Sequence, residues 1–164
     1  GKVLMNPNDI SARSHLQWAA TCAINGWASP GDAWTPIHQV GHMLTSLYKV
    51  SHGASLSILM PAWMGYMYER RKKQYFRFAK NVMQIETAGK SEDEVILLGI
   101  QRFKDFLAGI GAPVSLKDVG VENADVDAIV KGVVKVSFNK DGYLTCQPQP
   151  VSADDIKNVL FKVV

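Results

Sequence analysis

The chain has 164 residues, of which 47% are hydrophobic and 20% are charged, and its formal net charge is +3. These ordinary values argue against disorder and suit a single domain, over residues 1–164, with a sizeable core. No run of eighteen apolar residues, no start typical of a signal peptide and no basic stripe interleaved with aromatic residues is present, so we expect neither a membrane span nor a nucleic-acid partner.

The first predicted helix begins after Asn8-Asp9, which offers an N-cap, and ends near Asn25-Gly26. Six of its residues form an apolar stripe: Ile10, Leu16, Ala19, Ala20, Ala23 and Ile24. A loop follows at residues 29–32. Thr35-Pro36 is typical of an N-cap followed by a first-turn proline, so a second helix is predicted from there to about Tyr48.

The third apolar segment, from Gly53 to about Tyr68, follows the short connection at residues 49–51. It is apolar almost all round, which is typical of the buried central helix of a bundle. Pro61 lies inside it and is expected to kink or break the helix. The Met- and Trp-rich part at residues 60–67 is more typical of a buried core than of a ligand-binding surface.

Further helices are predicted at residues 70–84, 92–109, 123–135 and 152–162, so the fold class is an all-α helical bundle. Ser91-Glu92-Asp93-Glu94 is a capping-box pattern, and Pro113 with Ser115 opens a short helical turn. Residues 136–148 indicate a small hairpin or an extended excursion. The basic cluster at residues 70–73 indicates a solvated helix end, with an anion or partner patch as the alternative.

Three of the four histidines fall within fifteen residues, while His15 in the first helix indicates a surface or interface position. His38 and His42 are spaced i, i+4, so they share one helix face and could bind one divalent metal, although this spacing also occurs by chance. On one continuous helix, His52 would lie about 21 Å from His38. The chain must therefore reverse near residues 49–51 if His52 is to face His38. A metal or catalytic role and an incidental cluster both stay open.

Other signals near the histidines are few. Gly41, inside the second helix, costs about 1 kcal/mol against alanine, so a packing or access reason is expected. No carboxylate has an obvious ligand spacing, and the nearest one in sequence, Asp32, lies in a predicted loop. A buried zinc or iron ion needs three or four protein ligands, and the chain is short of them. Cys22 and Cys146, far apart in sequence, indicate a reduced, cytoplasmic protein.

The pattern His38-x-x-x-His42, then His52-Gly53, then Leu59-Met60-Pro61 resembles the C-terminal domain of the iron-containing (group III) alcohol dehydrogenases. The butanol dehydrogenase and aldehyde reductase branch is most similar. Residues 18–26, 32–35, 76–82, 106–113 and 151–156 fit the same pattern. The resemblance implies an all-α bundle of the dehydroquinate synthase-like type, although the Trp-Ala-Ala-Thr segment argues against dehydroquinate synthase or glycerol dehydrogenase itself.

The resemblance also implies a site. One Fe(II) or Zn(II) is held by an Asp and three His in that family, and His38 and His52 correspond to two of these ligands. His42 corresponds to an additional, catalytic histidine, which replaces the pairing of His38 with His42 that spacing alone suggests. The remaining Asp-x-x-x-His pair is absent from the sequence. The chain is therefore expected to be a fragment that lacks the first part of the metal-binding domain and the nucleotide-binding domain, which mainly binds NAD(P).

The implied activity is NAD(P)-linked interconversion of a primary alcohol and its aldehyde, with the metal as a Lewis acid on the small-molecule substrate. The fragment alone is expected to be inactive, and the resemblance is compatible with a homo-oligomer. The alternative is a self-contained helical metal-binding or interaction domain.

Overall fold

Two separate groups of helices make up the computed structural model, which describes residues 1–27, 36–146 and 149–164. The first unit is Gly1–Trp34 and the second is Thr35–Val164. In the described part of the chain, the secondary structure is helical apart from one isolated antiparallel bridge between Leu144 and Val151. The predicted all-α class is therefore confirmed.

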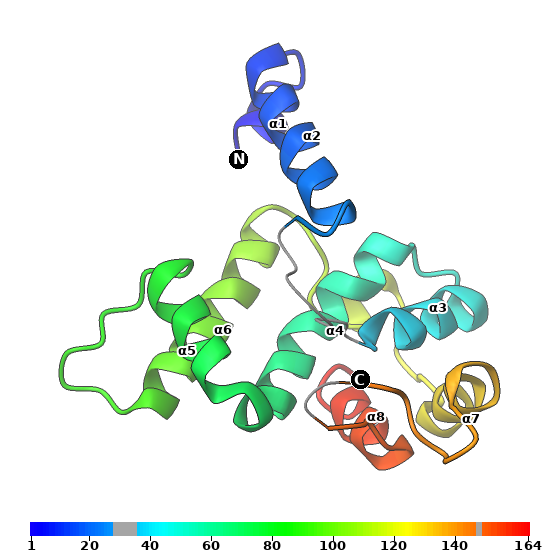
Figure 1. Ribbon diagram of the computed structural model, residues 1–164. Coiled ribbons are helices and arrows are strands. Elements are labelled where there is room, and N and C mark those ends of the chain that lie inside the picture. Colours follow the sequence, from blue (N-terminus) through cyan, green and yellow to red (C-terminus); the bar gives the residue numbers. More distant parts are fainter. Residues whose placement is uncertain (28–35, 147–148) are drawn as a thin grey trace. The chain divides into compact units, whose positions relative to one another are not determined.

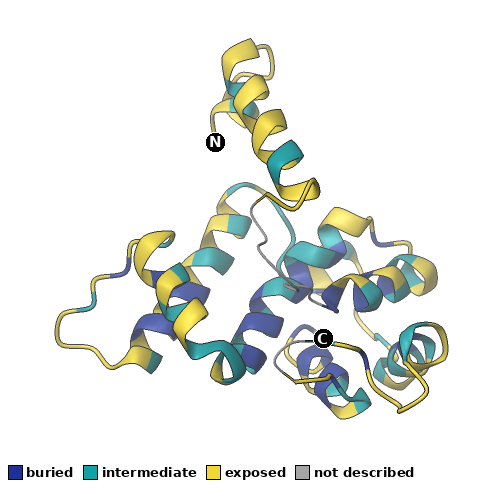
Figure 2. Cartoon of the chain, viewed as in Figure 1, coloured by how far each residue is buried: buried dark blue, intermediate teal, exposed yellow. Residues whose placement is uncertain are grey.

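The first unit consists of α1 (Lys2–Met5) and α2 (Ile10–Ile24). The predicted N-cap is confirmed, because the Asp9 carboxylate accepts a hydrogen bond of 2.9 Å from the Ala12 backbone N–H. The predicted apolar stripe is not buried: no residue of α2 is buried, and Figure 2 shows the helix mostly in the colour of exposed residues. Among the described residues of this unit, α1 packs on α2 and Trp27 contacts Trp18, and the single turn of α1 is too short to cover the stripe. The predicted loop at 29–32 and Thr35 lie outside the described residues.

The second unit is built around one central helix. Its elements are α3 (Ile37–Tyr48), α4 (His52–Met67), the 3-10 turn η1 (Tyr68–Arg71), α5 (Lys72–Asn81), α6 (Glu92–Gly109), the 3-10 turn η2 (Lys117–Val119), α7 (Val126–Ser137) and α8 (Ala153–Leu160). Helices α3, α6 and α8 all pack on α4, while α5 packs on α6 and α7 packs on α3 and α8 (Figure 1). This places α4 at the centre, as its almost uniformly apolar sequence predicts.

The core of this unit follows α4, whose buried side chains include Ile58, Leu59, Trp63, Met64 and Met67. The prediction that the Met- and Trp-rich part belongs to the core is therefore confirmed. No helix in the described ranges is both long and apolar enough to cross a membrane.

Of the two outcomes predicted at Pro61, a kink or a break, the break is wrong, because α4 continues through this residue. Proline has no N–H to donate to the carbonyl of Ser57 four residues earlier, which removes one helical hydrogen bond. Pro61 is itself buried in the unit, and α3, α6 and α8 surround the helix. Tertiary packing of this kind overrides a local propensity.

Several helix ends follow the sequence signals. Ser91 and Glu94 form both hydrogen bonds of the predicted capping box, and α6 ends before Gly111, which has φ +78°. Three predicted helices are shorter than expected, among them α8, which spans Ala153–Leu160 instead of 152–162. The segment 70–84 begins as η1 and ends at Asn81, and α7 begins at Val126 because Asp125 is its N-cap. Near residues 136–148 a hairpin or an extended excursion was predicted. Among the described residues there, the strand-like pairing is a single bridge between Leu144 and Val151.

Two residues of the basic cluster at 70–73 form ion pairs within the chain. Arg70 pairs with Asp155 of α8 at 2.7 Å, and Lys72 pairs with Asp93 of α6. Lys73 is exposed, as expected for a solvated helix start.

Candidate metal centre

The three clustered histidines meet where the chain reverses between α3 and α4. Helix α3 ends at Tyr48, the following Lys49 has a left-handed conformation with φ 60°, and α4 begins at His52. This reversal brings Nδ1 of His38 within 3.2 Å of Nε2 of His52. The predicted turn at residues 49–51 is confirmed, and His52 faces His38 across the two helices.

His42 joins the cluster differently. Its ring stacks on that of His52, with the centroids 4.9 Å apart and the planes at 30°, whereas His38 and His52 are tilted by 40°. His52 therefore contacts both α3 histidines, one through a ring nitrogen and one through its face. All three side chains are exposed to solvent, and so is His15 in α2.

The electrostatics of the cluster favour neutral imidazole at His38. Partial burial lowers the pKa of His38 from its ordinary value, and the neighbouring His52 and His42 lower it further, because a cation there would be poorly hydrated and repelled. A neutral imidazole has the free lone pair that a metal ion requires. The lowered pKa of His38 thus favours the form that can bind a metal ion.

The distance between the His38 and His52 nitrogens suits two ligands of one metal ion. Two nitrogen ligands at about 2.0–2.1 Å from a tetrahedral zinc ion lie about 3.3 Å apart, close to the 3.2 Å between the His38 and His52 nitrogens. Within residues 1–27, 36–146 and 149–164, no group of three or more His, Cys, Asp or Glu side chains is arranged to hold a metal ion. Asp32 lies outside these ranges.

Gly41 and Ser55 pack against each other beside the histidine cluster. Gly41 is buried on α3, and a Cβ on it would lie 2.7 Å from Oγ of Ser55 on α4. The prediction that Gly41 has a packing reason is confirmed. Ser55 gave no signal in the sequence, because a serine three residues after a histidine is common and its partner becomes visible only when the helices are placed together.

The family model described as "Fe-containing alcohol dehydrogenase family, C-terminal" matches residues 1–164. The chain belongs to this family.

Relatives are known for the whole of the chain. It is 32% identical to NADH-dependent butanol dehydrogenase B of Clostridium acetobutylicum, with 100% of this chain and 42% of that protein covered. The NADPH-dependent aldehyde reductase YqhD of Escherichia coli is 30% identical, with 85% of this chain and 37% of that protein covered. The crystal structure of NADH-dependent butanol dehydrogenase A from Thermotoga maritima matches with a TM-score of 0.87 and 37% identity, covering 99% of this chain and 42% of that one. The chain thus spans about two fifths of the length of these relatives.

Proposed function

We propose that the protein carrying this chain is a metal-dependent, NAD(P)-linked oxidoreductase that interconverts primary alcohols and aldehydes. The observation that carries the proposal is the 3.2 Å separation between Nδ1 of His38 and Nε2 of His52, which suits two ligands of one Fe(II) or Zn(II). Family membership and the names of the relatives, two butanol dehydrogenases and an aldehyde reductase, support the reaction class.

Each histidine has a separate role in this proposal. His38 and His52 hold the ion, which when bound supplies Lewis acidity to the substrate oxygen. His42 stacks on the ring of His52 and presents no nitrogen to the His38–His52 pair, so it is free to hold or move a proton beside the substrate. The NAD(P) site is assigned mainly to a nucleotide-binding domain, because this sequence has no glycine-rich phosphate motif.

Metal analysis of histidine variants tests these roles in the full-length protein. His38→Ala and His52→Ala should each abolish metal loading, because each removes one ligand. His42→Ala should retain the metal and lower turnover. His15→Ala, an exposed histidine of the other unit, serves as the control and should change neither quantity. Retention of metal by His52→Ala would overturn the ligand assignment.

The isolated 164-residue chain should show no NAD(P)H-dependent turnover, since it offers two ligands of the four and no cofactor motif. Measurable turnover by these residues alone would contradict the proposal. Tight stoichiometric metal binding by the isolated chain would instead favour a self-contained metal-binding domain. The proposal includes a cytoplasmic location and a homo-oligomer, and light scattering of the full-length protein tests the latter.

A further inference from the structure

The contact between Gly41 and Ser55 lies directly beneath the paired histidines. Gly41 follows His38 by three residues and precedes His42 by one, while Ser55 follows His52 by three. On a helix, residues three apart lie on one face, so this contact is stacked one turn from the imidazole pair. The Gly41–Ser55 contact therefore lies on the helix faces that carry His38 and His52.

Ser55 also holds the helix turn that carries His52. Its side chain is completely buried, and its Oγ donates a hydrogen bond of 2.8 Å to the backbone carbonyl of His52. The Ser55 backbone N–H donates to the carbonyl of Ser51 at 2.9 Å. A buried hydroxyl needs such a partner, so its rotation away from His52 is unfavourable.

The space for this hydroxyl exists only because residue 41 has no side chain. A Cβ on Gly41 would lie 2.7 Å from Ser55 Oγ, whereas ordinary contact begins at 3.4 Å. The difference is about 0.7 Å, and metal–ligand distances tolerate only about ±0.2 Å. Alanine at position 41 therefore either separates α3 from α4 by more than a shared ligand site allows or turns Ser55 out of its bond to His52.

We propose that Gly41 and Ser55 are a positioning pair that sets the distance between the His38 and His52 imidazoles. Gly41 lets α4 approach, and Ser55 fixes the first turn of α4 against α3. Neither residue touches the reacting atoms. This inference rests on the proposed function, in which His38 and His52 share a metal ion.

Two other glycines provide controls that distinguish an effect on the distance between the histidines from an effect on helix packing. At Gly99 on α6 a Cβ would meet the Cβ of Ala79 on α5 and lie 2.8 Å from its Cα, so alanine there crowds a helix contact that holds no histidine. At Gly65 on α4 a Cβ would meet nothing within 4 Å. Gly99→Ala thus controls for crowding, and Gly65→Ala controls for changing a glycine within α4.

The experiment measures the Zn(II) affinity of the full-length protein by competition with a coloured chelator, together with the unfolding midpoint of the metal-free form. Gly41→Ala should weaken Zn(II) binding by roughly 10- to 100-fold, as outer-shell changes do. Gly99→Ala should lower the midpoint but keep the affinity within about twofold, and Gly65→Ala should keep the affinity as well. Equal loss of affinity in Gly41→Ala and Gly99→Ala would overturn the inference.

A second substitution tests the pair directly. Ser55→Ala removes Oγ and leaves the Ser55 Cβ at 3.6 Å from a Cβ on residue 41, which is an ordinary contact. Gly41→Ala/Ser55→Ala should therefore bind Zn(II) more tightly than Gly41→Ala and about as tightly as Ser55→Ala. If Gly41→Ala does not fold, the double variant should still fold and match Ser55→Ala. A double variant that fails to fold, or binds no better than Gly41→Ala, contradicts the pairing.

The two proposals fail in different ways. If the unmodified protein binds Zn(II) no more tightly than His38→Ala or His52→Ala, the proposed metal site is wrong. If it binds the metal through these histidines but Gly41→Ala binds it equally well, only the positioning role is wrong.

Discussion

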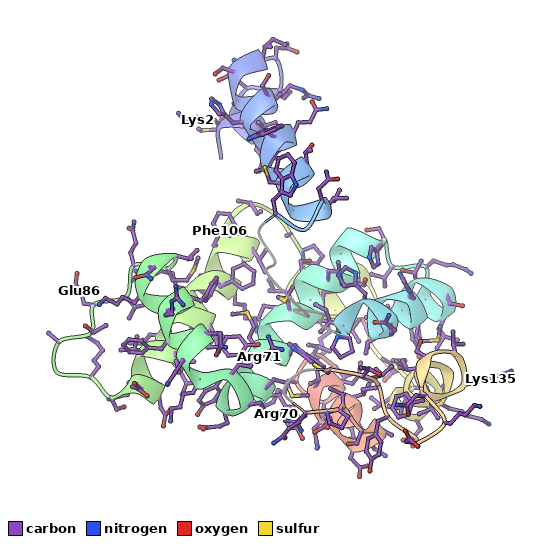
Figure 3. All side chains as sticks on the ribbon, viewed as in Figure 1. Lys2, Arg70, Arg71, Glu86, Phe106 and Lys135 are labelled. Atoms are coloured by element: carbon purple, nitrogen blue, oxygen red, sulfur yellow. The ribbon has the colours of Figure 1, made fainter. Side chains whose placement is uncertain are left out.

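Replacing Asp155 should destabilise the second unit strongly, because this carboxylate joins α8 to the end of α4. Its Oδ1 accepts hydrogen bonds from Arg70 at 2.7 Å and from the Tyr66 hydroxyl at 3.0 Å. Its Oδ2 accepts from the backbone N–H and the hydroxyl of Ser152 at 2.9 and 3.1 Å. The Asp155 side chain is only 11% exposed and that of Arg70, labelled in Figure 3, is 26% exposed.

The size of the effect follows from this burial. Removing one partner of a buried ion pair costs about 3–5 kcal/mol. Arg70 also donates to the carbonyl of Pro150 at 3.3 Å, so it would keep one partner and the lower end applies. We expect Asp155→Ala to lower the free energy of unfolding by about 3 kcal/mol and Asp155→Asn, which keeps the shape, by about 1–3 kcal/mol.

The effect of Asp155 should depend on pH. Burial of the carboxyl opposes its ionisation, but hydrogen bonds from Ser152, Arg70 and Tyr66 and the guanidinium charge outweigh burial, so the pKa of Asp155 is lowered from its ordinary 3.8. A lowered folded-state pKa means that the stabilisation is complete above the unfolded pKa and is lost as the pH falls through the folded one. Wild type and Asp155→Asn should therefore differ most near neutral pH and converge in acid.

Urea denaturation of the 164-residue chain at neutral and acidic pH measures both effects. Asp127→Asn is the control, because its pair with Lys157 at 2.7 Å is exposed, with 80% of the Asp127 side chain accessible, and exposed pairs contribute little. A change below about 1 kcal/mol in Asp155→Ala, less than the low end expected for a buried pair, would refute the reasoning. So would a difference between wild type and Asp155→Asn that persists unchanged in acid.

Two further predictions concern α5 and α6. Ser91→Ala removes the hydrogen bond that the Ser91 hydroxyl accepts from the Glu94 backbone N–H in the α6 capping box, and it should lower the free energy of unfolding by about 1 kcal/mol in urea denaturation. Ser46→Ala, an exposed serine inside α3, should have a smaller effect. Burial raises the pKa of Tyr75 to about 12, so a spectrophotometric titration should show a late ionisation that becomes smaller in Tyr75→Phe. An unchanged titration curve in Tyr75→Phe would contradict this.

Local sequence signals predicted the fold well where they act within one turn. The cap at Asp9 and the capping box at Ser91 each involve atoms a few residues apart, so the sequence contains all that is needed. Pro61 shows the limit of such signals. Its effect depends on the helices packed around α4, and no pattern within α4 reveals them.

The site was predictable in part for the same reason. Spacing alone required a reversal between His38 and His52, and the structure places that reversal at Lys49. Spacing alone suggested His42 rather than His52 as the partner of His38, because His38 and His42 share one helix face. The choice depends on ring orientation, which the packing of α3 on α4 determines: His52 offers a nitrogen to His38 and its face to His42.

The supporting contact could not be predicted, because it depends on which residue of α4 lies opposite Gly41. A glycine inside a helix signals a close approach without naming the partner. Once Ser55 is known to be that partner, the spacing of the histidines, the glycine and the serine along the sequence can be explained. His38, Gly41 and His42 occupy one turn of α3, and His52 and Ser55 occupy the first turn of α4, so one helix contact determines the spacing of both donors. On the proposed assignment, two imidazoles held in this way fix the separation of two ligands before any metal arrives, and affinity is then limited by the number of ligands rather than by their geometry.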